Sequence, residues 1–396
     1  MTFFPEALEL TGDLISLRHA LHREPERGLH LPQTQSKVLA ALDGLPLEVH
    51  TGSELTSVTA VLRGERPGPV VLLRGDMDAL PLHEESGVEY TSEIDGAMHA
   101  CGHDLHTAML VGSARLLARR ISELPGSVIF MFQPGEEGFN GAARMIEEGV
   151  LEAAGEPPVA AYAVHVTSSR LPIGKFTARP GTMSASETTI EVTVRGKGGH
   201  SSRPHTAADP IPVAAEMVTA AQIQITRTTD VFDPVVFTVG TFHAGTAVNA
   251  IPETASFAGS LRTCSEKNWR AVPERLEALF EGIAAAHGLS VEVTIHAGYP
   301  AVVNEADAID LAGRVASHIS GDDGWGIDEH PIMGSEDFSW VLQKIPGAMV
   351  SLGARPAGAD TSAPTNHSTK AVFDDAALPY GAAFMADMAW ERLQLG

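Results

Sequence analysis

The sequence predicts an α/β protein in which a mostly parallel central sheet, flanked by helices, is interrupted by a smaller α+β unit. Short apolar runs such as Val70–Leu73, typical of strands buried on both faces, alternate with helical patterns and predict the sheet. Strict alternation of apolar and polar residues begins only near Ser186, and it predicts half-buried strands in a second unit. At 396 residues and 44% hydrophobic content, the chain is long enough for two domains.

The first part of the chain shows helical and strand patterns in turn. They predict, in order, a helix over residues 6–22, a second helix before residue 45, strands at 57–64 and 69–81, a helix from Asp104, a strand at 127–132 with a helix after it, and a strand at 160–166. Several of these strands end in side chains that can bind metal. In open α/β sheets, ligand sites lie at the carboxyl ends of such strands.

The segment MHACGHDLH, residues 98–106, holds the densest group of metal-ligating side chains. Cys101 and His103 are separated only by Gly102, which lets the backbone bend so that both can face one ion. The helical pattern that follows places them at a helix N-terminus, with Asp104 suited to cap or charge-complement the first turn. A thiol in such a position has a depressed pKa, which suits either a metal ligand or a nucleophile.

Paired carboxylates follow two of the predicted strands. Asp76 and Asp78 leave one strand on the same side, so one could face a metal while the other anchors a turn. Glu136 and Glu137 follow another, and adjacent carboxylates on a strand point to opposite sides. If Glu137 binds metal, Glu136 is free to move protons for a water on that metal.

The alternating strands define an insertion into the larger domain. Helical stretches at 209–224 and 266–287 separate them, and the α/β pattern resumes after Gly298 with a helix at 308–319, a strand at 347–354 and a C-terminal helix. The predicted domains are therefore 1–182 with 296–396, which form a discontinuous catalytic domain, and 183–295.

Composition restricts the partners and the compartment. With 27 basic and 50 acidic residues the net charge is −23, which disfavours nucleic acid and anionic membranes as partners. The chain has only Cys101 and Cys264, and neither a signal-like N-terminus nor a long apolar stretch, so a cytoplasmic protein is expected.

The combined motifs resemble the metallopeptidase family M20, in particular its amidohydrolase branch of N-acyl-amino-acid amidohydrolases, hippurate hydrolases and auxin-conjugate hydrolases. The resemblance runs in order along nearly the whole chain, through RGDMDALP, HACGHDLH, QPGEEG, AVHV, GGHSSRPH, GTFHAGTAVNAIP, GSLRT, MGSEDF and NHS. Other M20 branches have His-x-Asp where this chain has Asp76-x-Asp78, and this difference together with Cys101 favours the amidohydrolase branch.

This resemblance implies a role for each matching residue. It implies a catalytic domain with two divalent metal ions, interrupted by a lid and dimerisation domain, and a homodimer. Glu136 would be the general base, Asp78 would orient a ligand or the base, and His200 would act on the partner subunit's site to stabilise an oxyanion. Substrate contacts would come from Asn249, Arg262 and Gly334. The implied metal ligands are Cys101, His103, Glu137, His165 and His367.

Two points stay open in this assignment. Arg262 either pairs with a free carboxylate of the substrate or forms a salt bridge on an edge strand. The metal is also undetermined, because a thiolate favours zinc or cobalt while carboxylate and imidazole tolerate manganese or nickel.

The leading hypothesis is a metal-dependent hydrolase that cleaves the amide bond of N-acyl amino acids with a water activated by two metals. Alternatives with the same fold are a dipeptidase and an N-acetyldiaminopimelate deacetylase. A Cys101 nucleophile with a histidine base is a different enzymatic reading, and a non-catalytic amino-acid-binding module is the alternative outside enzymes.

Overall fold

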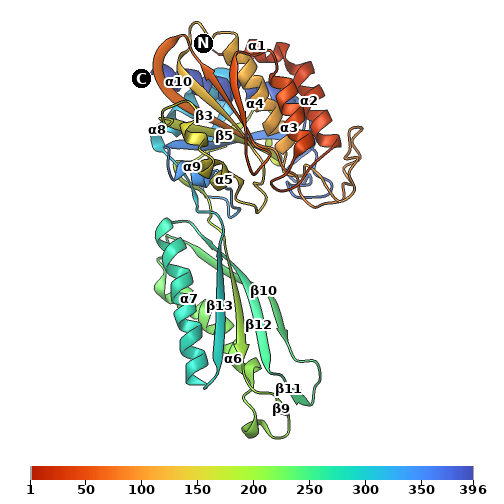
Figure 1. The fold of residues 1–396 in the computed structure, drawn as a ribbon, viewed down its shortest axis with the longest axis vertical. Helices are drawn as coiled ribbons and strands as arrows, with labels where there is room; N and C mark the ends of the chain where they lie inside the picture. The colour runs from red at the N-terminus through yellow and green to blue at the C-terminus, as the bar shows by residue number, and fades with distance from the viewer. Residues whose placement is uncertain (1, 396) are drawn as a thin grey trace. The chain divides into compact units, whose positions relative to one another are not determined.

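The computed structural model describes residues 2–395, which form two compact units (Figure 1). The larger unit comprises the chain up to Met183, Val303–His330 and the chain from Asp337. The smaller unit comprises Ser184–Val302 and the loop Pro331–Glu336. No helix in the described part of the chain is both long and apolar enough to cross a membrane.

The larger unit is built on a sheet whose described strands run in the order β1-β2-β4-β3-β5-β16-β6-β15. Its central strands β4, β3, β5 and β16 pair in parallel, so the predicted fold class is confirmed. The run Val70–Leu73 lies in β3, between β4 and β5, and is buried as its composition predicts. The strands are β1 (Leu47–Thr51), β2 (Val58–Arg63), β3 (Arg66–Asp76), β4 (Pro125–Gln133), β5 (Ala160–Pro172), β6 (Phe176–Ala178), β15 (Trp325–Ile327) and β16 (Gly347–Arg355).

Helices flank this sheet. The helix expected over 6–22 is two helices that meet at Leu10, where the Thr11 hydroxyl donates to the carbonyl of Leu8 and competes with the helical pattern. The helices are α1 (Phe4–Glu9), α2 (Thr11–Arg23), α3 (Pro32–Leu42), α4 (His103–Ala118), α5 (Gly141–Glu147), α8 (Ala306–Ser320), α9 (Ser339–Leu342) and α10 (Leu378–Gln394).

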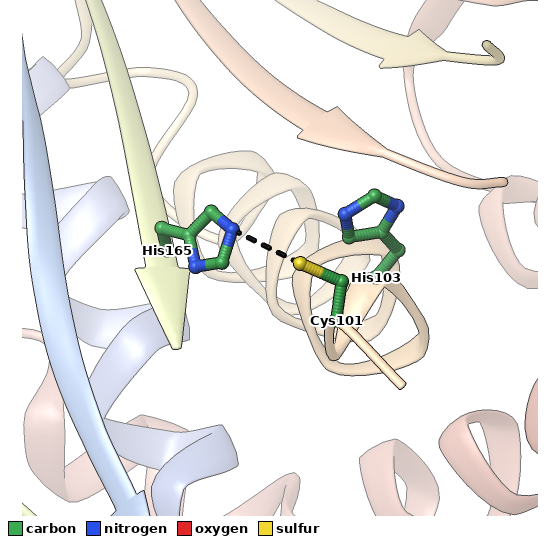
Figure 2. Close-up of side chains that lie close together, drawn as sticks. All are labelled: Cys101, His103 and His165. Atoms are coloured by element: carbon green, nitrogen blue, oxygen red, sulfur yellow. Dashed lines mark hydrogen bonds between the residues drawn. The ribbon is translucent and has the colours of Figure 1, made fainter. Parts of the chain in front are cut away.

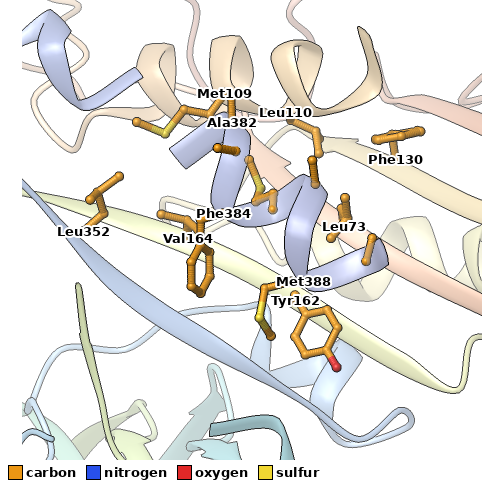
Figure 3. Packing of buried hydrophobic residues seen from close by; sticks show 14 of the residues in the cluster. Leu73, Met109, Leu110, Phe130, Tyr162, Val164, Leu352, Ala382, Phe384 and Met388 are labelled. Atoms are coloured by element: carbon orange, nitrogen blue, oxygen red, sulfur yellow. The ribbon is translucent and has the colours of Figure 1, made fainter. Parts of the chain in front are cut away.

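The helices α4 and α10 pack closely against each other and against the sheet. Small residues make this approach possible: a Cβ added to Gly112 would lie 2.8 Å from the Cβ of Ala382, and one added to Gly381 would lie 2.2 Å from the Met109 sulfur. Their apolar side chains and those of the strands form one core (Figure 3). This packing places the start of α4 beside the carboxyl end of β3 and the middle of β5.

The smaller unit is an antiparallel sheet in the order β10-β12-β8-β13, with two helices packed on one face. Burial alternates along β8 and β12, as the sequence pattern predicts for half-buried strands. Its elements are β8 (Thr188–Arg195), α6 (Pro210–Thr228), β10 (Val235–Ala244), β12 (Thr254–Thr263), α7 (Glu266–Ala286) and β13 (Ser290–Ala297). Short strands pair as β9 (Gly199–His200) with β11 (Ala250–Ile251) and β7 (Gly181–Ser184) with β14 (Val302–Asn304).

Candidate metal centre

The turn into α4 directs two metal-ligating side chains to the same place. Gly102 has a φ of 87°, and a Cβ added there would lie 2.3 Å from a methyl group of Val166, so only glycine fits this turn. Cys101 and His103 flank it at the helix N-terminus, as predicted. Asp104 does not cap the helix. Its carboxylate faces α2 instead, and accepts hydrogen bonds there.

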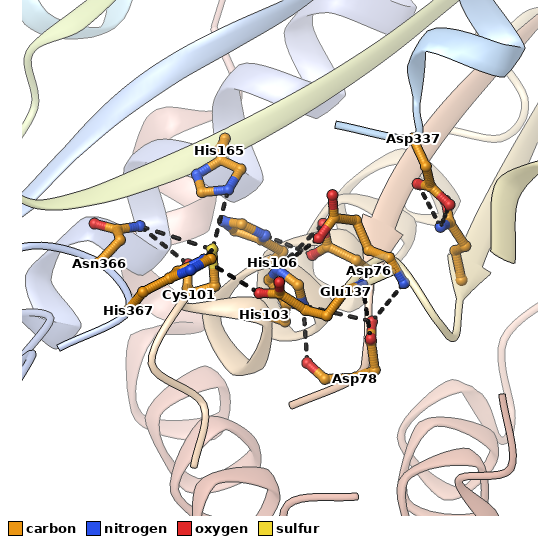
Figure 4. Close-up of polar contacts among 12 residues, drawn as sticks. Asp76, Asp78, Cys101, His103, His106, Glu137, His165, Asp337, Asn366 and His367 are labelled. Atoms are coloured by element: carbon orange, nitrogen blue, oxygen red, sulfur yellow. Dashed lines mark hydrogen bonds and ion pairs between the residues drawn. The ribbon is translucent and has the colours of Figure 1, made fainter. Parts of the chain in front are cut away.

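Five side chains from four segments meet beside this turn (Figure 4), and Figure 2 shows three of them, Cys101, His103 and His165. The Cys101 sulfur lies 3.4 Å from Nε2 of His165, at the end of the apolar part of β5, and 3.2 Å from Nε2 of His367. The same nitrogen of His367 lies 3.3 Å from Oε1 of Glu137. Two triads have potential ligand atoms within 4.8 Å of one another, Cys101–His103–His165 and Cys101–Glu137–His367. We call these five residues the metal cluster.

The ring nitrogens of two histidines in the metal cluster are oriented by backbone carbonyls. Nδ1 of His103 donates to the carbonyl of Asp78 at 2.8 Å, and Nδ1 of His165 donates to the carbonyl of Val166 at 2.9 Å. Each bond assigns the proton to Nδ1, which leaves the lone pair of Nε2 facing the cluster.

Buried atoms without a hydrogen-bond partner mark the same place. Among residues 2–395, Nε2 of His103 and Oε1 of Glu137 are buried and accept no hydrogen bond. Buried polar atoms are normally satisfied, and a divalent cation would satisfy both of these. Thiolate, imidazole and carboxylate are also the donor types of catalytic zinc and related sites, so the residues present fit a metal.

The electrostatics of the cluster favour a cation. Burial by itself would raise the pKa of the Cys101 thiol, but the surrounding imidazoles, His165 foremost, hold that pKa well below its usual value. The pKa of His367 is raised to about 10, because its ring interacts with the Cys101 sulfur and the Glu137 carboxylate. Groups that attract a proton this strongly also attract a metal ion, so protons and metal compete for them.

The Glu136–Glu137 pair follows β4, as predicted, but it lies in a turn and not in the extended backbone from which opposite side-chain directions were expected. The carboxylate of Asp78 accepts both backbone N–H groups of the pair, from Glu136 at 2.9 Å and from Glu137 at 3.1 Å. Glu137 faces His367, and Oε2 of Glu136 lies 4.0 Å from Nε2 of His103; ligand atoms of His103, Glu136 and Glu137 lie within 4.8 Å of one another. One aspartate thus fixes the direction of both glutamates.

A second group of polar side chains lies at the ends of β3 and β4, and its members bond to one another and to neighbouring protein groups. Arg74 donates to Gln133 at 2.8 Å and to Asp337 at 3.0 Å, and it pairs with Asp76. Gln133 donates to both oxygens of Asp337, at 2.7 and 2.8 Å. We call Arg74, Asp76, Gln133 and Asp337 the strand-end network. Asp76 therefore bonds to this network and to His106, and its Oδ2 also lies 3.7 Å from Nε2 of His103 in the metal cluster.

His106 is not available as a ligand, although it belongs to the same sequence segment. Its Nδ1 donates to Oδ1 of Asp76 at 2.6 Å, and its Nε2 accepts the N–H of Val166 at 2.9 Å. Both ring nitrogens are therefore used within the protein. Residue type and spacing alone do not distinguish His106 from His103, because the partners of both lie in other segments; the family resemblance implied His103 as the ligand.

Asn366 has a positioning role that sequence reasoning missed. Its side-chain amide donates to the carbonyl of Val166 at 3.0 Å and to that of Cys101 at 3.3 Å, while its oxygen accepts the N–H of Ser168 at 3.0 Å. It therefore ties three segments together next to His367. Its place immediately before that histidine was the available signal.

The remaining predicted site residues belong to the smaller unit. His200 is exposed in β9, where its Nδ1 accepts the N–H of Ser202 at 3.2 Å. The backbone carbonyl of Asn249 accepts the N–H of Ser201 at 3.1 Å. Gly334 lies in the exposed loop Pro331–Glu336.

Arg262, also in the smaller unit, donates to Glu187 at 3.1 Å from β12. This is a salt bridge, but β12 has strands on both sides and is not the edge strand of the alternative reading. That bond comes from Nη2; the second terminal nitrogen, Nη1, is buried and makes no hydrogen bond with the described residues. The role of Arg262 toward a substrate stays a prediction.

Known proteins resemble this chain in sequence over most of its length. The model of peptidase family M20/M25/M40 matches residues 72–391. The chain is 36% identical to thermostable carboxypeptidase 2 of Saccharolobus solfataricus, over 96% of this chain and 95% of that one. It is 34% identical to the N-acetylcysteine deacetylase of Bacillus subtilis, over 95% and 96% of the two chains. It is 32% identical to the hippurate hydrolase of Campylobacter jejuni, over the full length of both.

Solved structures resemble the chain over nearly its full length. A protein from methicillin-resistant Staphylococcus aureus aligns with a TM-score of 0.92 and 28% identity, over 99% of both chains. A dinuclear metal-binding peptidase of the M20 family from Bacillus subtilis aligns with a TM-score of 0.83 and 31% identity, over 98% of this chain and 99% of that one.

Proposed function

This chain belongs to peptidase family M20/M25/M40 and is a metal-dependent hydrolase of C–N bonds, and we propose that it cleaves the amide bond of N-acyl amino acids. The products are a carboxylic acid and a free amino acid. The observation that carries the proposal is the metal cluster with Glu136 beside it. The relatives named for deacetylation of N-acetylcysteine and for hydrolysis of hippurate support the same substrate class.

The proposed ligands are the five residues of the metal cluster, which would hold two divalent ions. When bound, such ions supply a water of lowered pKa and polarise the carbonyl to be attacked. Cys101 belongs to both triads of potential ligand atoms, which supports a site for two ions. The thiolate favours zinc or cobalt, with manganese and nickel as further candidates.

Glu136 is the proposed general base. It is 6% exposed and has a carboxylate oxygen within 4.8 Å of ligand atoms of His103 and Glu137, outside both Cys101 triads. This supports a carboxylate that takes a proton from the attacking water. The same carboxylate would then deliver the proton to the leaving nitrogen. Asp78 would keep the base in position through the two backbone N–H groups that it accepts.

The residues of the smaller unit complete the proposal. His200 would stabilise the oxyanion from the partner subunit, while Asn249, Arg262 and Gly334 would contact the amino-acid part of the substrate. The homodimer through this unit, which His200 requires, is part of the same proposal.

Metal removal combined with a substrate panel tests this function. We expect N-acetyl, N-benzoyl and peptidyl derivatives of several amino acids to be hydrolysed, with activity lost on chelation and restored by manganese or zinc. Elemental analysis of the purified protein should give about two ions per chain, as in two-metal hydrolases. A metal-free preparation that stays active and is inactivated by thiol alkylation would favour Cys101 as a nucleophile instead. Tight amino-acid binding without hydrolysis would favour a binding module.

A peptidase activity is the second candidate, and a specific finding favours it: the carboxypeptidase relative is 36% identical. A peptide is an acylated amino acid, so the same groups could act on it. Peptides and acetylated diaminopimelate in the panel separate the two candidates by their kcat/KM ratios.

A further inference from the structure

A cavity of about 430 Å³ lies in the larger unit at the amino ends of β5 and β16. The first residues of these strands, Ala160 and Gly347, form part of its wall, together with the start of α8 and the end of α10. No residue of the metal cluster lines it. Its volume is within the range of small-molecule sites. The cavity is therefore a candidate binding site separate from the metal cluster.

A buried tyrosine presents its hydroxyl to this cavity. Tyr162 of β5 is 2% exposed, and its ring packs in the core of the larger unit while the hydroxyl points away from that core (Figure 3). The residue lines the cavity, and its hydroxyl makes no hydrogen bond with another residue among 2–395. Burial raises its pKa above the usual value, so it stays a donor. Buried tyrosine hydroxyls usually have a partner, which a ligand would supply here.

Charges of both signs lie near this hydroxyl. The charged residues in the wall are Arg392, Glu305 and Asp307. After burial, the main influences on the pKa of Tyr162 are Arg392, which lowers it, and Glu305, which raises it. A guanidinium has five N–H groups, so Arg392 can bond to the protein and to a ligand at once. Arg392 and Tyr162 together can therefore donate to one carboxylate.

Glu305 is held in place at the start of α8. Its Oε2 accepts the N–H of Ala308 at 2.9 Å, and its own N–H donates to the carbonyl of Gly347 at 2.9 Å. Its Oε1 makes no hydrogen bond with the described residues and can accept one from a ligand. With Asp307, negative charge exceeds positive charge in the wall. A ligand that carries a cation as well as a carboxylate is therefore favoured over a carboxylate alone.

The rest of the wall is largely apolar. Leu311 of α8 is buried, Pro346 precedes β16, and Leu395, which is 67% exposed, follows α10. An apolar group of a ligand would remove part of this surface from water. The cavity thus offers apolar contact beside a pair of opposite charges.

We propose that this cavity binds a free α-amino acid with an apolar side chain. The carboxylate of the amino acid accepts hydrogen bonds from Tyr162 and Arg392, and its ammonium group donates to Glu305. Its side chain contacts Leu311 and Pro346. The inference concerns binding alone and does not depend on the proposed reaction.

Titration calorimetry of the holoenzyme tests which chemical groups the cavity recognises. L-leucine is the probe, because it has both charges and a branched apolar side chain. Isocaproate lacks the ammonium group of leucine, and isoamylamine lacks the carboxylate. Each should bind at least about 10-fold more weakly than leucine, because each leaves one charge of the wall without its partner. Equal affinity for leucine and isocaproate, or no heat with millimolar leucine, would overturn the inference.

Variants of the wall test where leucine binds. Tyr162→Phe removes only the hydroxyl, and Arg392→Met removes the cation, so each should raise the Kd for leucine by about 10-fold. The controls are Tyr380→Phe and Arg314→Met, which change residues of α10 and α8 outside the wall and should leave the Kd unchanged. Wild-type affinity in both Tyr162→Phe and Arg392→Met would place leucine elsewhere and overturn the inference.

A third variant separates loss of a contact from damage to the fold. Glu305→Gln keeps an oxygen that can accept the N–H of Ala308 but removes the charge. It should weaken leucine by about 10-fold and leave isocaproate no weaker than in the wild type, because only leucine has an ammonium group. Equal weakening of both ligands would overturn the role of Glu305 and with it the inference.

The outcome is distinguishable from that of the proposed function. Amino acids are products of the proposed reaction, so leucine could also bind at the metal cluster. The variants of Tyr162, Arg392 and Glu305 leave that cluster intact and change only binding in this cavity. A chain that hydrolyses no acylated amino acid but binds leucine through these three residues would lose the proposed function and keep this inference.

Discussion

Two groups of buried polar side chains lie at the same end of the large sheet, and they differ in how their atoms are satisfied. In the strand-end network, Gln133 and the carboxylates of Asp76 and Asp337 are all bonded to protein groups. In the metal cluster, buried atoms of His103 and Glu137 accept no hydrogen bond from the described residues. A network that satisfies itself fixes the structure, whereas a group that does not is suited to bind something else.

The largest expected effect concerns the base beside the metal cluster. Glu136→Gln removes the proton acceptor but none of the proposed ligands, so kcat should fall by about 10⁴-fold while the metal content by elemental analysis stays constant. Glu137→Gln is the contrasting variant, because it should lose metal as well as activity. Hydrolysis by Glu136→Gln at the native rate would show that Glu136 is not the general base.

The next effect concerns stability and tests the strand-end network directly. Arg74 is 2% exposed, and Arg74→Met leaves two buried carboxylates without their cation, so the free energy of unfolding should fall by about 4 kcal/mol. Arg63→Met, which removes an exposed arginine paired with Glu48, should change it by less than about 1 kcal/mol. Both can be measured by urea unfolding.

Urea unfolding of a variant at a proposed ligand tests the contrast between the metal cluster and the strand-end network. In metal-free protein, Cys101→Ala should cost about 1 kcal/mol, because the hydrogen bonds of its sulfur with His165 and His367 are weaker than the buried ion pairs of Arg74. If Cys101→Ala costs as much as Arg74→Met, the distinction between the two groups is wrong.

A smaller effect is expected in the pH dependence of the free energy of unfolding. It comes from His22 of α2, whose ring nitrogens lie 2.8 Å from Asp104 and 3.1 Å from Glu84. Burial would lower the pKa of His22, but the carboxylates of Asp104 and Glu84 outweigh it and raise the pKa to about 9. Since this pKa is above the unfolded value near 6.5, the stabilisation is fully present below pH 6.5 and is lost as the pH rises toward 9, by about 3 kcal/mol.

The pH effect is measured as the difference in unfolding free energy between wild type and His22→Gln across pH 6 to 9.5. This difference should shrink as the pH rises. The same difference for His83→Gln, an exposed histidine, should stay flat. A pH-independent difference for His22→Gln would mean that the ring is neutral in the folded protein.

The smallest effect concerns the aspartate that orients the glutamate pair. Asp78→Asn replaces one acceptor oxygen by a donor that faces a backbone N–H, so metal affinity or activity should fall by about 10- to 100-fold. Titration of the metal-free protein with manganese measures it, and Asp13→Asn, at an exposed site, is the control. Unchanged metal affinity and activity would show that the turn holds its shape without Asp78.

Much of the site could be anticipated because its signals are local. The Cys101-Gly102-His103 spacing and the apolar runs before Asp76 and Glu136 are readable within a few residues, and the strand-end rule then gathers them. The parallel sheet follows from the same runs. The roles assigned to the individual site residues stay predictions, since they came from the family resemblance.

What the sequence could not give depends on partners far along the chain. Arg74 donates to Asp337, 263 residues away in the sequence, and Arg18 donates to Asp104, 86 residues away. Neither pair can be recognised from nearby residues. The break at Leu10 follows from the local hydrogen bond of the Thr11 hydroxyl, which the apolar periodicity does not report. The short strand β1 was missed because its weak local preference is decided by tertiary packing.

The left-handed turn at Gly102 has a consequence for how this chain can change over time. Any side chain there must both adopt a disfavoured φ and displace Val166, which is part of the strand that carries His165. Random mutagenesis followed by selection for activity should therefore recover glycine alone at this codon.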